Sequence, residues 1–245
     1  METTRKRILV VEDDPQMSKF IQFKLNYLGY EVVGEAANGE DAQTRASMLK
    51  PDLILMDIML DGAEDGIETA LKISARQNVP IVYLTAHEDE ALFERAKITE
   101  PFGYLIKPFN DRDLRIVLET SLYRHEQDQI IKRVLQDVRN VLDSSVDIMI
   151  TYNLQGHIIE FNRRAVEAFG LKRQAAKKHL ISDFVCEDSA ASILLDGDFE
   201  AVHLHEKICF LDNSGQRFDT ELVLSPLRDP RRRVEGRLLV ARLRA

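Results

Sequence analysis

Short apolar runs alternate with longer amphipathic stretches through the first half of the chain. Each run is nearly continuous in apolar residues, which is typical of a strand buried on both faces. Strands of this kind that alternate with helices indicate a doubly wound α/β fold with a five-stranded parallel sheet. The pattern predicts strands at residues 7–11, 31–35, 53–56, 81–84 and 103–106, and helices at 15–28, 39–49, 66–76, 89–98 and from 111 onward.

The last of these helices is unusually long. From Asp111 the sequence continues without glycine or proline to about Leu142, well beyond the usual length of a globular helix. Its second part carries Ile131, Leu135, Val138 and Leu142 at alternating steps of four and three residues. This spacing is typical of a short coiled coil. We expect either a dimer seam or an amphipathic face that packs on the chain's own second domain.

The second half of the chain has a different pattern. Residues 147–152 and 157–161 form two predicted strands around a turn, as in a hairpin, and a short helix follows at 162–170. Further strands are predicted at 202–211, 217–226 and 234–243. Strands on either side of grouped helices indicate an α+β domain with an antiparallel sheet. We therefore divide the chain into a domain at 1–122, a connecting helix at 123–142 and a second domain at 143–245.

Composition places the chain among ordinary globular proteins. Its 245 residues are 44% hydrophobic and 30% charged, and no apolar stretch approaches the roughly 18 residues that a membrane span requires. The first seven residues lead directly into the first strand, so we expect no signal peptide. Two cysteines, Cys186 and Cys209, are too few for a disulfide framework or a metal cluster. We expect plain thiols and a cytoplasmic protein.

The acidic charge is confined to the first domain. Residues 1–122 hold 14 Lys and Arg against 22 Asp and Glu, which accounts for the whole formal charge of -8. An acidic domain disfavours nucleic acid and suits a pocket that gathers a divalent cation. Near the C-terminus the basic run 231–233 follows Asp229-Pro230, so we interpret it as a solvated turn. We expect neither direct nucleic-acid binding nor membrane association.

Polar side chains follow four of the predicted strands. They are Glu12 and Asp13 after the first strand, Asp57 after the third, Thr85 after the fourth and Lys107 after the fifth. The carboxyl ends of parallel strands in an open α/β sheet meet at one crevice, so we expect these groups to converge. Each residue alone has an ordinary explanation as a helix cap or a turn. Their occurrence together, in this order, favours a functional site.

The chemistry of these groups fits phosphoryl transfer to a carboxylate, which yields an acyl phosphate. Glu12, Asp13 and Asp57 offer oxygens to a hard divalent cation such as Mg²⁺, and the backbone carbonyl of Met59 is a further candidate ligand. The ammonium group of Lys107 can neutralise charge on the phosphoryl oxygens. The threonine hydroxyl after the fourth strand can contact the new phosphoryl oxygen.

With these motifs, residues 5–122 resemble a response-regulator receiver domain. The matching segments are Ile8–Asp14, Asp57, Thr85-Ala86 and Lys107-Pro108-Phe109. The resemblance implies that Asp57 is the phosphoacceptor for a histidine kinase, and that Glu12 and Asp13 belong to its Mg²⁺ site. It also implies that Thr85 and Tyr104 are switch residues and that the peptide bond before Pro108 is cis.

Residues 143–245 resemble a PAS domain. The stretches that carry the resemblance are 146–151, 156–162, 168–170, 215–218 and 222–227. The resemblance implies a five-stranded antiparallel sheet that senses a ligand or mediates dimerisation. We expect neither haem nor flavin, because the lone His179 is typical of a surface residue and the Asn-Cys-Arg-Phe motif of flavin-binding PAS domains is absent. The ligand of this domain stays open.

Together the two resemblances predict a response regulator in a two-component pathway. A histidine kinase phosphorylates Asp57, and the long helix carries the change to the PAS domain of a homodimer formed through that helix, the PAS domain or both. The only catalysis expected is self-phosphorylation and dephosphorylation of the receiver. One alternative is a fragment or partner of a hybrid histidine kinase, although no ATP-binding glycine-rich box follows. Another is an Asp-nucleophile phosphatase, which favours Asp-x-Asp where this chain has Met59.

Overall fold

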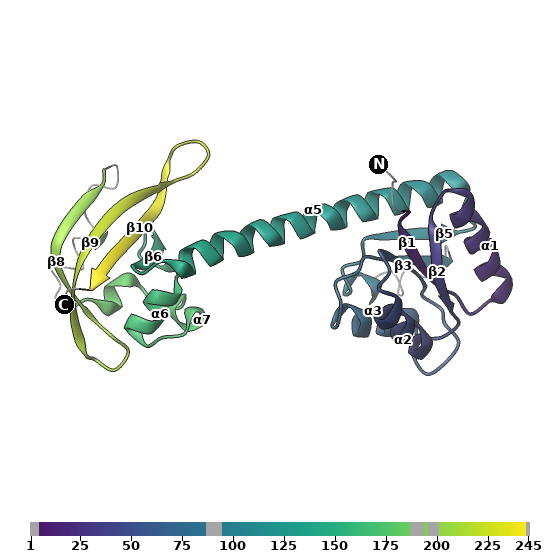
Figure 1. Ribbon diagram of the computed structural model, residues 1–245, viewed down its shortest axis with the longest axis horizontal. Helices are drawn as coiled ribbons and strands as arrows, with labels where there is room; N and C mark the ends of the chain where they lie inside the picture. The colour runs from purple at the N-terminus through teal and green to yellow at the C-terminus, as the bar shows by residue number, and fades with distance from the viewer. Residues whose placement is uncertain (1–4, 87–94, 187–193, 196–200, 244–245) are drawn as a thin grey trace. The chain divides into compact units, whose positions relative to one another are not determined.

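The chain folds into two compact units, Met1–Lys132 and Arg133–Ala245. The computed structural model in Figure 1 describes residues 5–86, 95–186, 194–195 and 201–243. The long helix α5 (Asp111–Ser144) begins in the first unit and ends in the second. Within the described ranges, no helix combines the length and the apolar character needed to cross a bilayer.

The first unit is built on a parallel five-stranded sheet with the order β2-β1-β3-β4-β5. Its strands are β1 (Arg7–Val11), β2 (Glu31–Ala36), β3 (Leu53–Asp57), β4 (Ile81–Ala86) and β5 (Gly103–Lys107). The helices described in this unit are α1 (Pro15–Tyr27), α2 (Gly39–Leu49), α3 (Gly66–Ser74) and the first part of α5. Residues 95–97 are also helical, whereas 89–94 of the predicted fourth helix lie outside the described residues.

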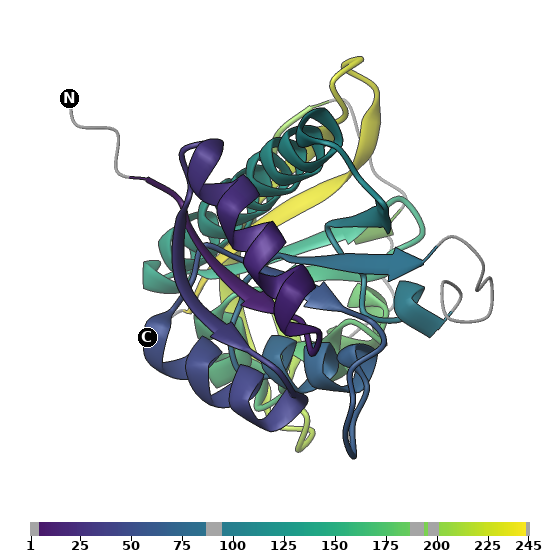
Figure 2. The same ribbon diagram turned by 90° about the vertical axis from the view of Figure 1, so that its right-hand side faces the viewer.

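Helices cover both faces of this sheet, as Figure 2 shows. Alternate residues of a strand point to opposite faces, so Ile8 and Val10 pack with α1 and α5, whereas Leu9 and Val11 pack with α2 and α3. Both clusters are buried, and the central strands β1, β3 and β4 are buried over most of their length, whereas the edge strands β2 and β5 are partly exposed. The prediction of a doubly wound parallel sheet is confirmed.

Short polar side chains set where the helices of this unit begin. Asp14, Asn38 and Asp65 each accept a hydrogen bond from a backbone N–H in the first turn of α1, α2 and α3, which satisfies a donor that the helix itself leaves unpaired. Gly29 follows α1 with a φ of 90°, a conformation that favours glycine at a helix end. These local signals fix the loops at both ends of the strands.

The second unit is an antiparallel five-stranded sheet with the order β7-β6-β10-β9-β8. Its strands are β6 (Ile148–Asn153), β7 (Ile158–Phe161), β8 (His203–Leu211), β9 (Arg217–Arg228) and β10 (Val234–Leu243). The helices α6 (Arg163–Phe169) and α7 (Arg173–Ala176) and the 3-10 helix η1 (Ile181–Phe184) lie between β7 and β8 in the chain. The predicted α+β domain with an antiparallel sheet is confirmed.

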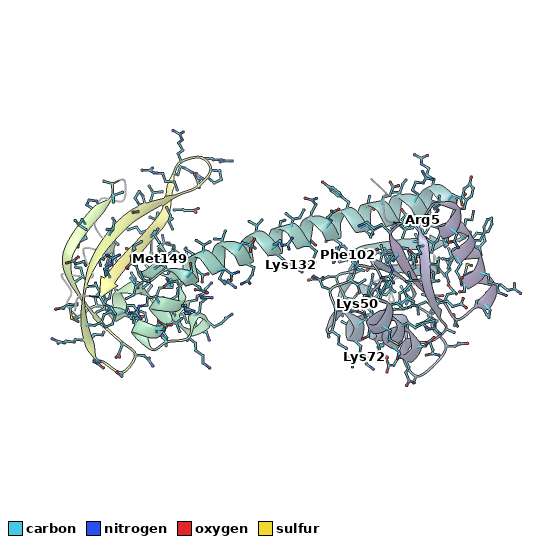
Figure 3. All side chains as sticks on the ribbon, in the orientation of Figure 1. Arg5, Lys50, Lys72, Phe102, Lys132 and Met149 are labelled. Carbon is cyan, nitrogen blue, oxygen red and sulfur yellow. A yellow bond between two sulfur atoms is a disulfide. The ribbon has the colours of Figure 1, made fainter. Side chains whose placement is uncertain are left out.

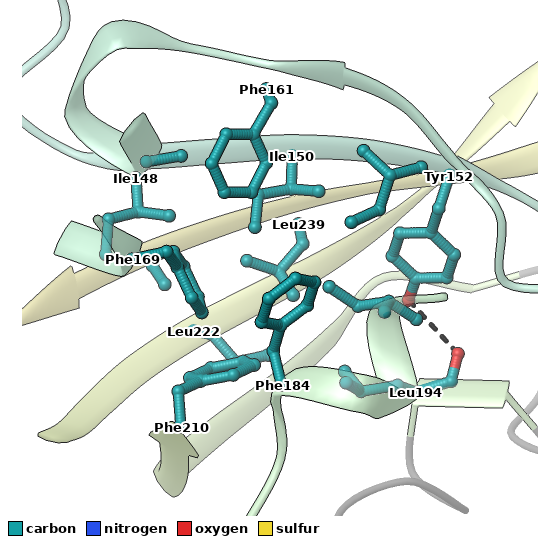
Figure 4. Close-up of a cluster of buried hydrophobic side chains, with 14 of the residues drawn as sticks. Ile148, Ile150, Tyr152, Phe161, Phe169, Phe184, Leu194, Phe210, Leu222 and Leu239 are labelled. Carbon is teal, nitrogen blue, oxygen red and sulfur yellow. Dashed lines mark hydrogen bonds between the residues drawn. The ribbon is translucent and has the colours of Figure 1, made fainter. Parts of the chain in front are cut away.

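Aromatic rings fill the core of the second unit (Figure 4). The ring of Phe169 lies 5.3 Å from that of Phe184 and 5.6 Å from that of Phe210, in edge-on arrangements. Such pairs are favourable beyond the apolar area they bury. At the other end of the cluster the hydroxyl of Tyr152 donates to the carbonyl of Leu194 at 3.1 Å. These residues place α6, η1 and the sheet around one hydrophobic core.

The two cysteines form a disulfide. The sulfur atoms of Cys186 and Cys209 lie 2.05 Å apart, and their Cα atoms are 5.5 Å apart. The expectation of plain thiols is therefore wrong. The physical reason is antiparallel strand pairing: Val185 pairs with Phe210 of β8, so the residue after Val185 lies opposite the residue before Phe210. A separation of 23 residues gave no sign of this pairing in the sequence.

Asn162 joins the end of α5 to the second unit. Its side-chain amide donates to the carbonyls of Leu142 and Asp147, each at 3.0 Å. Its side-chain oxygen accepts from the backbone N–H groups of Met149 at 3.0 Å and Ala165 at 2.9 Å. The side chain is 1% exposed, so water cannot replace these partners. One residue thus fixes α5, β6 and α6 against each other.

Replacing Asn162 with alanine should destabilise the second unit by about 2–4 kcal/mol, because buried backbone groups lose their partners. Urea unfolding of the full chain measures the change. Asn213→Ala is the matched control, since Asn213 is exposed in a turn, and we expect it to shift stability by less than about 0.5 kcal/mol. Equal effects of the two substitutions would contradict the role assigned to Asn162.

Candidate functional site

The carboxyl ends of the strands in the first unit place the predicted polar residues side by side. Asp57 is the last residue of β3 and pairs with Leu84, so Thr85 lies one residue beyond that pair on β4. Lys107 ends β5 opposite Ala86. Glu12 follows β1, and its N–H donates to the carbonyl of Ala36 at 3.0 Å. The sheet register therefore brings these residues to one edge.

Three carboxylates form a cluster at this edge. Glu12, Asp13 and Asp57 each offer an oxygen that lies within 4.8 Å of the others. Oxygens around an octahedral Mg²⁺ are about 3.0 Å apart when adjacent and about 4.2 Å apart when opposite, so the three carboxylates would draw together to bind one such ion. Glu12 is 4% exposed and Asp57 is 6% exposed. The donor atoms are hard oxygens, which fit Mg²⁺.

Lys107 connects two of these carboxylates. Its Nζ lies 2.6 Å from Oδ2 of Asp57 and 2.7 Å from Oε2 of Glu12. The peptide bond between Lys107 and Pro108 is cis, as the resemblance implied. The ammonium group offsets the repulsion between two buried acids.

The proximity of these groups changes their proton affinities. Burial raises the pKa of Glu12 to about 7, the negative charge of Asp57 acts in the same direction, and the hydrogen bond from Lys107 opposes both. Burial works to lower the pKa of Lys107, but hydrogen bonds to Asp57 and Glu12 outweigh it and raise that pKa. Near neutral pH the Lys107 amine is charged, and Glu12 holds a proton more readily than an ordinary carboxyl group. A divalent cation would therefore compete with a proton at Glu12.

Of the remaining predicted residues, Met59 contacts Asp57, whereas Thr85 and Tyr104 have other partners. The Thr85 hydroxyl donates to the carbonyl of Ala86 at 3.1 Å. The Tyr104 ring lies 5.9 Å from the ring of Tyr83 and packs against the core between the sheet and α2 and α3. Met59 donates its N–H to Oδ1 of Asp57 at 3.0 Å. The use of its carbonyl as a metal ligand stays a prediction.

Backbone groups of the loop after β3 also contact the site, and the sequence analysis missed them. The N–H of Asp61 donates to Oδ2 of Asp13 at 3.3 Å. Gly66 begins α3 so close to β3 that a Cβ there would lie 1.9 Å from the carbonyl oxygen of Asp57. A glycine directly after Asp65, which caps α3, is the one sequence signal that pointed to this close approach.

Two protein families match separate parts of the sequence. Residues 8–119 match the response regulator receiver domain. Residues 136–244 match the PAS fold. The two matches meet within α5, which contains the residues between them.

Curated relatives match the first half of the chain. The transcriptional regulatory protein PdtaR of Mycobacterium tuberculosis is 37% identical over 122 residues, which cover 50% of this chain and 59% of that protein. The DNA-binding response regulator MtrA of Mycolicibacterium smegmatis is 35% identical over 130 residues, which cover 52% of this chain and 55% of that protein. The chain thus spans little more than half the length of these relatives.

Solved structures match the same half. The signal receiver domain of a modulated diguanylate cyclase from Desulfovibrio desulfuricans G20 is 39% identical, with a TM-score of 0.49, and the match covers 51% of this chain and 99% of that one. NtrX from Brucella abortus is 22% identical with a TM-score of 0.50, and the match covers 54% of this chain and 30% of that one. The likeness to NtrX shows a shared fold.

The pKa of Glu12 predicts how the stability of the metal-free chain depends on pH. Its folded value of about 7 lies above the ordinary 4.5, so folding takes up a proton between these values and stability falls as pH rises through that window. Glu12→Gln removes this dependence. Urea unfolding in a chelator, at pH about 5 and about 8, should show the wild type losing stability relative to the variant. A constant difference between the two proteins would contradict the shift.

Proposed function

The chain carries a response regulator receiver domain followed by a PAS domain, and we propose that Asp57 accepts a phosphoryl group from a histidine kinase. The observation that carries this proposal is the contact of Lys107 with Asp57 at 2.6 Å inside a cluster of three acids. A lone buried aspartate would be a poor nucleophile, whereas one beside a fixed cation can take up a phosphoryl group without accumulating charge.

In the proposed reaction a carboxylate oxygen of Asp57 attacks phosphorus. A P–O bond forms, the bond from phosphorus to the donor's histidine nitrogen breaks, and that nitrogen keeps the electron pair. Lys107 pairs with the phosphoryl oxygens, and the N–H of Met59 holds the carboxylate by its other oxygen. Mg²⁺, when bound by Glu12, Asp13 and Asp57, supplies further neutralisation of the phosphoryl charge.

We propose that Thr85 and Tyr104 report the phosphate to the surface. Tyr104 lines a groove of about 500 Å³ together with Lys107, Pro108 and Asp113. Movement of Lys107 toward a phosphoryl group would therefore alter this groove, because Tyr104 and Lys107 belong to the same strand, β5. The phosphate shifts the balance between two arrangements only by the difference in its interaction with each.

We propose that α5 passes the change to the PAS domain. Its last turns are tied to that domain by ion pairs, since Asp143 binds Arg173 at 2.6 Å and Arg173 binds Glu160 at 3.1 Å. Burial works to raise the pKa of Asp143, but hydrogen bonds from Arg173 and from the backbone of Arg163 outweigh it and lower that pKa. These contacts support a rigid connection between the end of the helix and the PAS core.

We propose that the chain is a homodimer through the middle of α5. The helix exposes one apolar stripe, and Figure 3 shows the side chains along this segment, with Lys132 labelled. The stripe consists of Ile130, Ile131, Val134, Leu135, Val138 and Val141, each about half exposed or more. These residues fall on one side of the helix, as in a coiled coil. A second copy of the same helix offers a matching stripe.

A cytoplasmic location and the lack of direct nucleic-acid binding remain predictions. The disulfide removes the argument for the compartment that rested on the cysteines. The relatives named as transcriptional or DNA-binding regulators match over 122 and 130 residues, which leaves the PAS half of this chain without a counterpart in those matches. The proposed catalysis is limited to self-phosphorylation and dephosphorylation of the receiver.

Acetyl phosphate with Mg²⁺ should add one phosphoryl group to the wild-type chain and none to Asp57→Asn. The physical reason is that the amide is a far weaker nucleophile than the carboxylate. Intact-protein mass spectrometry measures the addition. Asp61→Asn is the matched control, because this exposed aspartate lies in the adjacent loop and should leave phosphorylation unchanged. Phosphate on Asp57→Asn would sink the proposal.

Leu135→Arg should weaken self-association of the chain by at least roughly tenfold, since it places like charges face to face in the apolar stripe. Sedimentation across a concentration series, with and without acetyl phosphate, measures the effect. Gln136→Arg is the control, because Gln136 lies on the opposite side of the helix and pairs with Asn140 at 2.9 Å. A wild-type chain that stays monomeric in both states would rule out the dimer.

A further inference from the structure

The disulfide lies at the outer strand of the PAS sheet. Cys209 is part of β8, which is the last strand in the sheet order and pairs on its inner side with β9. Cys186 follows η1 and lies against the outer side of β8. The bond therefore connects the helical segment of the domain to the edge strand of the sheet.

Backbone pairing holds the two cysteines together independently of their sulfur atoms. The N–H of Cys186 donates to the carbonyl of Cys209 at 3.1 Å, and the preceding residue, Val185, pairs with Phe210. Phe184 and Phe210 are buried in the hydrophobic core, 6% and 1% exposed. Opening the sulfur–sulfur bond removes none of these contacts. The thiols would stay facing each other at high effective concentration, which favours closure of the same bond.

Both cysteines lie where the domain is partly open to solvent. Each is partly exposed, unlike the phenylalanines next to them. Thiol–disulfide exchange needs an attacking thiolate to approach one sulfur, so exposure decides whether the folded protein reacts. A disulfide that only stabilises a fold is typically protected from the glutathione pool, whereas exposed ones are the labile and regulatory ones.

We propose that Cys186 and Cys209 form a reversible thiol–disulfide exchange site, a redox input to the PAS domain that is separate from Asp57. A dithiol reductant attacks one sulfur, the Cys186–Cys209 bond breaks, and a mixed disulfide forms. The second thiol of the reductant then releases the protein as two thiols. Two electrons and two protons pass to the cysteines, and the reductant is left as a disulfide.

A reversible disulfide also agrees with the cytoplasmic location that we propose for this chain. Disulfides of reducing compartments are mostly transient and redox-sensing, whereas permanent ones belong to oxidising compartments. In the reduced form the hydrogen bond between Cys186 and Cys209 loses its covalent support. The attachment of η1 to β8 then opens more often, which changes the surface at the edge of the sheet.

Equilibration of the full chain in mixed reduced and oxidised glutathione tests the proposal. Alkylation followed by intact-mass measurement should show conversion between no reactive thiols and two. The midpoint glutathione ratio should be the same whether the chain starts oxidised or reduced, and the circular dichroism spectrum should not change. Hydrogen exchange at residues 181–186 and 203–211 should be roughly tenfold faster in the reduced form. The variant with both Cys186→Ser and Cys209→Ser should match the reduced form.

Three results would overturn the proposal. The first is that the disulfide is reduced only in denaturant. The second is that the reduced chain unfolds or does not form the bond again. The third is that hydrogen exchange is equal in the oxidised and reduced forms. The double serine variant distinguishes a redox role of the disulfide from a purely structural one. A folded variant with fast hydrogen exchange supports the redox site, whereas an unfolded variant would show that the bond is a permanent structural one. Phosphorylation of Asp57 by acetyl phosphate should proceed in both redox forms, which keeps this test distinct from that of the receiver.

Discussion

The hydrogen bonds from Lys107 to Glu12 and Asp57 are the interaction on which the receiver half depends. Two carboxylates that are almost fully buried repel each other and lose hydration, and each effect disfavours the charged form. The ammonium group offsets part of this penalty, and Glu12 still has a raised pKa. The site is therefore incompletely neutralised in the metal-free chain. The proposed divalent cation would supply the positive charge that the lysine alone does not provide.

The fold keeps this arrangement in place with backbone as much as with side chains. The parallel register delivers the acids and the lysine from three strands, the loop after β3 donates N–H groups to Asp57 and Asp13, and Gly66 lets α3 start against β3. Movement of one charged group must disturb the others. Lys107 thus links Asp57 to the surface groove that Tyr104 also lines.

The helix α5 belongs to both halves of the mechanism. Its first turns bury Leu114 and Leu118 in the receiver core, and its last turn is fixed to the PAS domain by Asn162 and by the pair of Asp143 with Arg173. Between these ends its apolar stripe is exposed. Such a helix is suited to transmit a shift at one end, because neither end can move without its domain.

The strands could be predicted from the sequence because buried parallel strands are continuous apolar runs. The convergence of Glu12, Asp57 and Lys107 could be predicted because the carboxyl ends of parallel strands lie at one edge of the sheet. The sequence did not reveal contacts that depend on three-dimensional pairing. The N–H groups of the loop after β3 carry no side-chain signature. The bond between Cys186 and Cys209 depends on the register of Val185 with Phe210. Asn162 was visible as a helix start, but its link to Leu142 was not.

Titration calorimetry of Mg²⁺ into the full chain, beside the Asp13→Asn variant, tests whether the three carboxylates form one metal site. We predict that the wild type binds one ion per chain at the cluster of Glu12, Asp13 and Asp57, and that loss of one carboxylate charge weakens this binding by roughly tenfold or more. Indistinguishable binding curves for the two proteins, or no binding by the wild type, would contradict it.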